Sequence, residues 1–213
     1  ERKELLEVIH AKLKAGGYIR TGFECYSLPD SPMTKAFNEG NAHYGASGHQ
    51  PGGKVNFIAV GSSSMSNLGN DYYVQNFYDI PSYKKALDKN QLPSFRGMKL
   101  NEDDKIRQHA TQQIRSYFRI DYKNFKEQFS INAKQYFKDE IIYMGEMQQD
   151  GLVEINDEGI FLTEVGKDFT QNIMNVFDKY DPPGKSYTER LETVKKAKES
   201  QAAVQEKFDS IQN

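Results

Sequence analysis

Apolar residues at helical spacing open the chain and predict an amphipathic helix over its first residues. They are Leu5, Leu6, Ile9 and Leu13, which fall on one helical face. Two glycines at positions 16 and 17 predict the end of this helix, because glycine favours the conformation found just beyond helix C-termini. Since the helical pattern is already under way at Glu1, which is not Met, we expect the chain to be a piece of a longer protein.

Three stretches in the first hundred residues have the pattern of β-strands. Residues Tyr18–Tyr26 alternate between apolar and polar side chains, with Gly22 as an irregularity, and predict one strand. The compact apolar run Val55–Val60 is typical of a buried strand, and Tyr72–Phe77 predicts another short strand.

Helices and loops are predicted between these strands. Pro32 and Pro81 are each well placed to open a short helix, over residues 33–39 and as far as about Lys89. Residues 40–53 are rich in Gly, Asn and His without a hydrophobic period, so they predict a loop, and residues 91–97 predict a linker.

From Leu100 the pattern becomes mainly helical. Asn101 followed by three acidic residues predicts a helix N-terminus, because a capping side chain and negative charge are both favoured there. Two further helices are predicted over residues 121–129 and 133–149. Residues 150–163 then alternate around an Asn-Asp-Glu-Gly turn at 156–159, which predicts a β-hairpin.

A last helix in this part is predicted from Thr163, with four apolar residues directed inward: Phe169, Ile173, Val176 and Phe177. Three helices followed by a hairpin form the outline of a winged helix. We therefore expect an α+β protein in three parts: residues 1–95 as one mixed region, 96–180 as a helical, winged-helix-like domain, and 181–213 as a charged helical tail beyond two prolines.

Composition narrows the class of protein. The 28 basic and 30 acidic residues leave a formal net charge of −2, which gives no general attraction to nucleic acid. No apolar run approaches the roughly 20 residues of a membrane helix, and no signal-peptide pattern is seen. Cys25 is the only cysteine, so no internal disulfide can form. We expect a cytoplasmic protein with no membrane or nucleic-acid partner, and a monomer.

A winged-helix outline raises DNA binding as an alternative. A DNA-reading module needs a basic recognition helix before the hairpin. Here acids balance the lysines over residues 133–147, and the wing turn Asn156–Glu158 is acidic, which disfavours contact with phosphate. A structural or substrate-covering domain therefore fits this region better than a DNA-binding one.

Ordered short motifs resemble one enzyme family over roughly residues 10–180. Residues 26–40 resemble its pattern of an aromatic residue, Pro-Asp and then Ala-x-x-x-Gly, and residues 61–66 resemble its Gly-Val-Ser-Ala-Ile-Ser. Further matches are Tyr-Ala-Gln-Asn at 73–76, Tyr-Tyr-x-Ala-Leu-Asp at 83–88, and Arg-Gly-x-x-Leu-x-x-Asp-Asp-x-x-Arg at 96–107. Residues 151–155 and 176–180 resemble the hairpin and last helix of this family. These motifs are similar to those of the oxygen-independent coproporphyrinogen III oxidases, which are radical S-adenosylmethionine enzymes.

The resemblance implies a parent enzyme that decarboxylates coproporphyrinogen III oxidatively to protoporphyrinogen IX in haem biosynthesis. It implies S-adenosylmethionine and a [4Fe-4S] cluster as cofactors, held by a Cys-x-x-x-Cys-x-x-Cys motif that this chain lacks. Residues 1–95 would then end the catalytic α/β barrel. At the family's second S-adenosylmethionine site, its aliphatic residue falls on Met65, and its Phe and Gln fall on Ala46 and Ser47. The tetrapyrrole and S-adenosylmethionine are the partners implied.

Other interpretations of these residues stay open. The lost Phe and Gln also fit a sibling radical enzyme with another tetrapyrrole substrate, such as the haem-utilisation relatives. Residues 61–66 are an ordinary turn or a ligand-binding loop, and the aromatic residues at 72–73 and 77–78 are core or a tetrapyrrole surface. His43 and His49 share a loop but lack companion carboxylates or thiolates, which disfavours a metal site, and we expect no catalytic acid or base in this chain.

The single cysteine generates a first prediction. A thiolate-held cluster takes three or four cysteines, so the 213-residue chain alone should carry no iron–sulfur cluster and show no oxidase activity. Anaerobic reconstitution followed by iron and sulfide assay measures this. A stoichiometric cluster on the monomer would contradict it.

Overall fold

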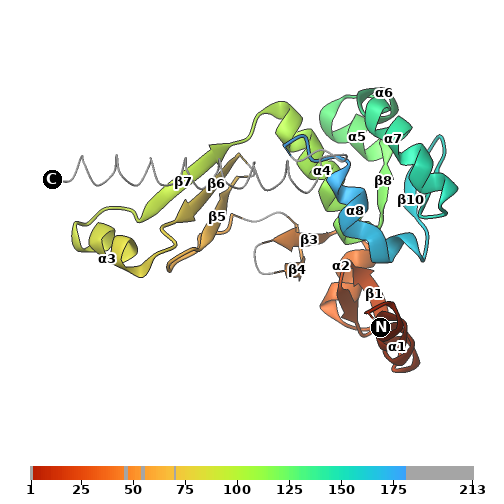
Figure 1. The fold of residues 1–213 in the computed structure, drawn as a ribbon, viewed down its shortest axis with the longest axis horizontal. Helices are drawn as coiled ribbons and strands as arrows, with labels where there is room; N and C mark the ends of the chain where they lie inside the picture. The colour runs from red at the N-terminus through yellow and green to blue at the C-terminus, as the bar shows by residue number, and fades with distance from the viewer. Residues whose placement is uncertain (1, 46–47, 54–55, 70, 181–213) are drawn as a thin grey trace.

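The computed structural model describes residues 2–45, 48–53, 56–69 and 71–180, with side chains from residue 4. These residues form a mixed α/β fold of small separate sheets and a helical core (Figure 1), and they contain no closed barrel. The sheet β5–β6–β7 with α3 extends to one side, helices α4–α8 gather on the other, and α1 lies below them. No helix in the described ranges has both the length and the apolar character needed to cross a bilayer.

The N-terminal part forms a helix, a hairpin and a second helix. Helix α1 (Arg2–Ala15) is confirmed, and α2 (Pro32–Asn38) begins after Ser31, whose side chain accepts the N–H of Thr34. The single strand predicted over residues 18–26 is wrong: β1 (Ile19–Gly22) and β2 (Cys25–Ser27) form an antiparallel hairpin. Gly22 and Glu24, at φ +140° and +56°, let the chain reverse within two residues.

Residues 40–53, predicted as a loop, contain a second hairpin. Strands β3 (Ala42–Gly45) and β4 (Gly48–Pro51) pair antiparallel in register from Ala42–Pro51 to Gly45–Gly48. Their residues lack the apolar alternation that marks a strand. Side chains of α4 (Glu102–Tyr117) bond to the backbone of β3, so this hairpin depends on contacts that a local pattern does not contain.

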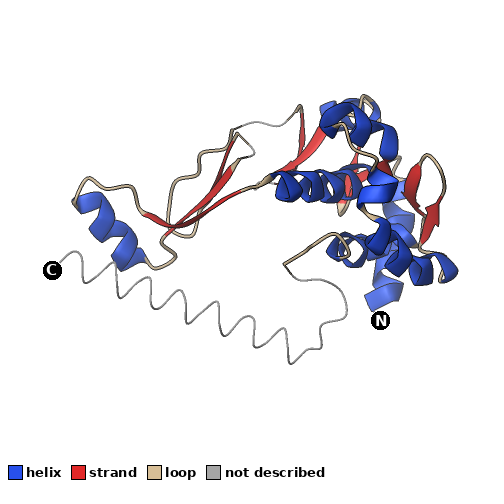
Figure 2. Cartoon of the chain, turned by 90° about the horizontal axis from the view of Figure 1, so that it is seen from above, coloured by secondary structure: helices blue, strands red, loops and turns tan. Residues whose placement is uncertain are grey.

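The extended sheet contains β5 (Met65–Leu68), the confirmed strand β6 (Tyr72–Asn76) and β7 (Ser94–Lys99), in the order β5–β6–β7. Helix α3 (Ile80–Asp88) is also confirmed and lies at the far end of this sheet (Figure 2). The linker predicted over residues 91–97 is wrong in part, because β7 begins at Ser94 and its backbone pairs with β6.

The buried strand predicted over residues 55–60 is also wrong. Within its described part, Phe57 makes one isolated bridge to Asn67, while Ile58 and Val60 are 76% and 87% exposed. An apolar run forms a buried strand only where a neighbouring element covers it. No described element covers Ile58 or Val60.

Most of the helical elements after residue 100 are confirmed. They are α4, α5 (Tyr122–Phe129), α6 (Ala133–Tyr136), α7 (Lys138–Gln149), η1 (Gly166–Phe169) and α8 (Thr170–Asn175). The predicted hairpin is β9 (Val153–Ile155) and β10 (Gly159–Leu162), and an unpredicted strand, β8 (Arg119–Asp121), pairs with β10. Phe169 is 43% exposed, so its predicted inward position is wrong.

The core of the molecule lies among these helices. Phe137 interrupts the helix predicted over residues 133–149, and its side chain is fully buried between Phe125 and Phe177. Its ring lies edge-on to theirs, at centroid distances of 5.6 and 5.1 Å. Burying a Phe side chain contributes about 2 kcal/mol or more, and the Phe137 backbone still donates to Ala133 and accepts from Ile141 at 2.9 and 2.8 Å across the junction of α6 and α7.

Arg20 of β1 joins the N-terminal hairpin to the helical core. Its guanidinium lies 5.2 Å from the ring of Phe118 and pairs with Asp168 of η1 at 2.9 Å. It also donates to the backbone oxygen of Lys167 at 2.9 Å. These contacts fix the position of β1 and β2 relative to the end of α4.

Gly159 gives a direct test of the β8–β10 pairing. A Cβ at this residue would lie 2.0 Å from the backbone oxygen of Ile120, so Gly159→Ala must push the strands apart. We expect the free energy of unfolding to fall by about 1–3 kcal/mol. In the control Gly145→Ala, nothing lies within 4 Å of the added atom, and α7 should gain up to about 1 kcal/mol. Denaturant unfolding measures both; equal effects would contradict this packing.

Candidate functional site

Two side chains of α4 hold β3 by its backbone. The Gln112 amide donates from Nε2 to the Tyr44 oxygen at 2.7 Å and accepts the Tyr44 N–H at 3.3 Å. The Tyr117 hydroxyl accepts the Ala42 N–H at 2.6 Å and donates to the Ala42 oxygen at 2.8 Å. We call Gln112 and Tyr117 the α4 clamp. It provides hydrogen-bond partners for the backbone N–H and C=O groups of β3 that do not pair with β4.

The other strand of this hairpin packs between β1 and α4. His49 Nε2 donates to the Arg115 backbone oxygen at 3.2 Å, and burial lowers the pKa of its imidazole. Gly22 is needed at this contact, because a Cβ there would lie 2.4 Å from His49 Nε2. His49 therefore acts as a neutral hydrogen-bonding group that positions β4.

A cavity of about 380 Å³ opens beside the hairpin, and its size is in the range of small-molecule sites. We call it the Met65 cavity. Its lining includes Tyr44 and Gly45 of β3, Phe57, and Met65 of β5, whose side chain is 46% exposed. The lining mixes aromatic and thioether surface with a few polar groups, which suits a flat organic ligand.

Of the three predicted site residues, Met65, Ala46 and Ser47, the structure describes only Met65. Met65 lines the cavity that carries its name, and Gly45, which immediately precedes Ala46, lies in the same lining. Ala46 and Ser47 themselves lie outside the described residues. The structure thus brings Met65 and β3 to the same cavity.

A second cavity, of about 410 Å³, shares two lining residues with the Met65 cavity, Tyr73 and Arg115. We call it the Lys179 cavity; its lining includes Asp104, Gln108 and Lys179. Sequence reasoning did not single out Arg115, because an arginine in a helical pattern carries no signal that separates a site from a solvated face.

Tyr73 projects from β6 into the boundary between the two cavities. Its hydroxyl oxygen accepts hydrogen bonds from the side-chain amides of Gln108 at 2.5 Å and Asn67 at 3.4 Å. Burial raises the pKa of Tyr73, more than the bond from Gln108 lowers it, so the phenol keeps its proton near neutral pH. The hydroxyl hydrogen remains available to a further acceptor.

The aromatic residues at 72–73 and 77–78, considered as a tetrapyrrole surface, do not share one face. Phe77 is 1% exposed and belongs to the core, whereas Tyr72 and Tyr78 are largely exposed. Tyr73 is the one of the four that lines these two cavities.

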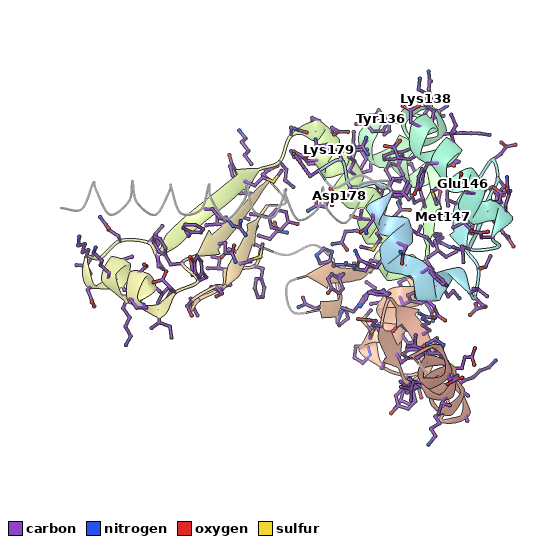
Figure 3. The ribbon with its side chains drawn as sticks, viewed as in Figure 1. Tyr136, Lys138, Glu146, Met147, Asp178 and Lys179 are labelled. Carbon is purple, nitrogen blue, oxygen red and sulfur yellow. The ribbon has the colours of Figure 1, made fainter. Side chains whose placement is uncertain are left out.

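An ionic cluster beside the Lys179 cavity links the residues after α8, and Tyr136 of α6, to the start of α4. Lys179 Nζ lies 2.7 Å from Asp103 and 2.6 Å from Asp104, and the Tyr136 hydroxyl donates to Asp103 at 2.5 Å (Figure 3). Arg107 pairs with Asp103 at 3.0 Å and with Glu140 at 2.7 Å. Asp103, Asp104 and Arg107 belong to the motif at 96–107, which therefore has a structural role.

The charges of this cluster are stabilised by one another. Burial alone would raise the pKa of Asp104, but hydrogen bonds from Lys179 and the Asn101 N–H outweigh it and hold the pKa below its usual value. Burial and the bond to Asp103 raise the pKa of Tyr136 to about 12. Asp104 also completes a capping box with Asn101 at the first turn of α4.

The residues present do not fit an iron–sulfur cluster. Cys25, the one cysteine, lies in β2 with its sulfur 3.4 Å from the Thr21 hydroxyl. Across the described ranges, no three His, Cys, Asp or Glu side chains gather as a metal site. His43 lines the Met65 cavity, whereas His49 is used in backbone contact.

Comparisons with known proteins agree with the motifs. Residues 100–169 match the family described as HemN C-terminal domain. The oxygen-independent coproporphyrinogen III oxidase of Pseudomonas aeruginosa is 30% identical over 182 residues, or 85% of this chain and 39% of that protein. The Escherichia coli enzyme of the same name is 28% identical over 180 residues, which cover 84% of this chain and 39% of that protein.

A solved structure matches as well. It is described as coproporphyrinogen III oxidase (HemN) from Escherichia coli, a radical SAM enzyme, and it has a TM-score of 0.77 and 29% identity. The match covers 82% of this chain and 40% of that one. The chain thus spans about two fifths of the length of these relatives. By motifs, sequence and fold, it belongs to the oxygen-independent coproporphyrinogen III oxidase-like radical S-adenosylmethionine family, in the part that includes the HemN C-terminal domain.

Proposed function

We propose that the parent protein of this chain is a radical S-adenosylmethionine oxidoreductase that acts on a tetrapyrrole in the cytoplasm. Its reaction would be the oxidative decarboxylation of coproporphyrinogen III to protoporphyrinogen IX. The observation that carries this proposal is the match over 85% of the chain to an oxygen-independent coproporphyrinogen III oxidase, joined to a TM-score of 0.77 with the Escherichia coli enzyme.

The chain would contribute a ligand-binding wall rather than the cluster. We place one S-adenosylmethionine or part of the tetrapyrrole in the Met65 cavity, where Tyr44 and Phe57 offer aromatic surface and Met65 a polarisable thioether. Ala46 and Ser47 would lie at the same ligand. The [4Fe-4S] cluster would need cysteines from elsewhere in the parent, since Cys25 alone does not hold one.

A sibling enzyme with a different tetrapyrrole, such as the haem-utilisation relatives, is the second candidate. One observation favours it: Ala46 and Ser47 stand where the resemblance expects Phe and Gln. A methyl in place of an aromatic ring and a hydroxyl in place of an amide remove stacking surface and one directed hydrogen bond. Such a change at the ligand would alter specificity.

For residues 96–180 we propose a winged-helix-like domain that covers the active site and does not bind DNA. The element order α4, β8, α5, α6–α7, β9, β10 and the sheet order β8–β10–β9 support the outline. The wing residue Asp157 is exposed and pairs with Lys134 at 2.7 Å, so the acid neutralises a lysine that DNA would otherwise contact. We expect the parent to act as a monomer.

Substitution at Met65 tests this function in the parent protein. Met65→Ser removes apolar contact with the ligand, so S-adenosylmethionine cleavage and coproporphyrinogen III decarboxylation should fall about 5- to 10-fold under anaerobic reducing conditions. Leu68→Ser is the matched control, because Leu68 lies in the same strand at 37% exposure and is not part of the cavity lining.

Three results are informative here. A fall limited to Met65→Ser supports the site, and equal rates in the wild type and both variants would remove the Met65 cavity from the reaction. A wild type that cleaves S-adenosylmethionine and leaves coproporphyrinogen III unchanged would favour the sibling enzyme.

A further inference from the structure

Arg115 lies where the Met65 cavity and the Lys179 cavity meet, and its guanidinium is incompletely paired. Its Nη2 donates one long hydrogen bond, of 3.3 Å, to the amide oxygen of Gln171. Its Nε–H is buried and has no acceptor. Within the described ranges it forms no ion pair with a carboxylate. Because burying an unpaired N–H of a charged group is costly, this position calls for an acceptor.

The neighbouring cations already have their counter-charges. Lys179 lies between Asp103 and Asp104, and Arg107 between Asp103 and Glu140. A negatively charged ligand entering the Lys179 cavity, which both groups line, would compete with carboxylates for them. It would meet no such competition at Arg115.

Tyr44 holds the guanidinium in place from one side. The Arg115 Cζ lies 4.1 Å from the centre of the Tyr44 ring, a distance typical of a cation–π contact. The α4 clamp in turn fixes the Tyr44 backbone through Gln112. The guanidinium still has the unpaired Nε–H, and the edge of a guanidinium matches the geometry of a carboxylate.

Tyr73 supplies a second donor at the same boundary. Its oxygen already accepts from Gln108 and Asn67, so its hydroxyl hydrogen is the remaining hydrogen-bonding capacity of the side chain. A buried guanidinium edge and a phenol hydrogen together present two donors and one positive charge. The adjacent lining of Phe57 and Met65 is apolar, which favours an organic carboxylate over a small inorganic anion.

We propose that Arg115 and Tyr73 form a carboxylate-binding subsite at the junction of the two cavities. The proposal rests on the proposed function and names the ligand group that this chain binds. That carboxylate comes from the amino-acid part of S-adenosylmethionine or from a propionate of the tetrapyrrole. Both sources share the chemistry, and binding measurements separate them.

The test is equilibrium dialysis of the 213-residue chain against three probes: S-adenosylmethionine, decarboxylated S-adenosylmethionine and coproporphyrin III. Arg115→Met should weaken binding of the carboxylate-bearing ligand about 10- to 100-fold, the loss expected for a hydrogen-bonded charge. Tyr73→Phe should weaken it less, and Arg119→Met is the control, since Arg119 is exposed and lines neither cavity. Arg115→Lys keeps the charge and serves where Arg115→Met does not fold.

Each outcome has one meaning. If Arg115→Met weakens the binding of S-adenosylmethionine and leaves that of its decarboxylated form unchanged, the bound group is the amino-acid carboxylate. If Arg115→Met weakens the binding of coproporphyrin III, the bound group is a propionate. A wild type that binds a probe, with Arg115→Met and Arg115→Lys binding it equally well, overturns the subsite and leaves the proposed function standing. A wild type that binds none of the probes overturns the subsite in this chain, and the proposed function is then decided separately by the decarboxylation assay in the parent protein.

Discussion

The hydrogen bonds from Gln112 and Tyr117 to the backbone of β3 are the constraint on which the candidate site depends. A two-stranded hairpin is marginal by itself, and β3–β4 has little apolar surface to bury. The α4 clamp replaces a third strand by pairing the Ala42 and Tyr44 backbones with side chains of a helix. Tyr44 is thereby fixed at once as a wall of the Met65 cavity and as the stacking partner of Arg115.

Helix α4 can perform this role because both its ends are held. At its start, Asn101 and Asp104 form a capping box and Lys179 neutralises two carboxylates. At its end, Phe118 adopts the left-handed conformation at φ 57° and packs against Arg20. The helix presents Arg115 where the two cavities meet, so a carboxylate bound to Arg115 would be positioned by α4.

Local patterns predicted the elements that carry their own signals. The capping residue Asn101 and the turn at 156–159 are such signals, and α4 and the β9–β10 hairpin appear where they were expected. The β3–β4 hairpin was missed because its partners, Gln112 and Tyr117, lie about 70 residues away in sequence. Met65 could be selected only through family resemblance. Arg115 could not be selected, because its missing counter-charge is visible only in three dimensions.

Amide hydrogen exchange at Ala42 and Tyr44 tests the account most directly, since their N–H groups bond to the α4 clamp. In Gln112→Ala/Tyr117→Phe, exchange at both amides should accelerate about tenfold or more, as expected for losing about 1 kcal/mol per bond, with the core of α4 unchanged. Tyr122→Phe is the control, because its hydroxyl is buried without a partner. Unchanged protection at both amides in the double variant would contradict the account.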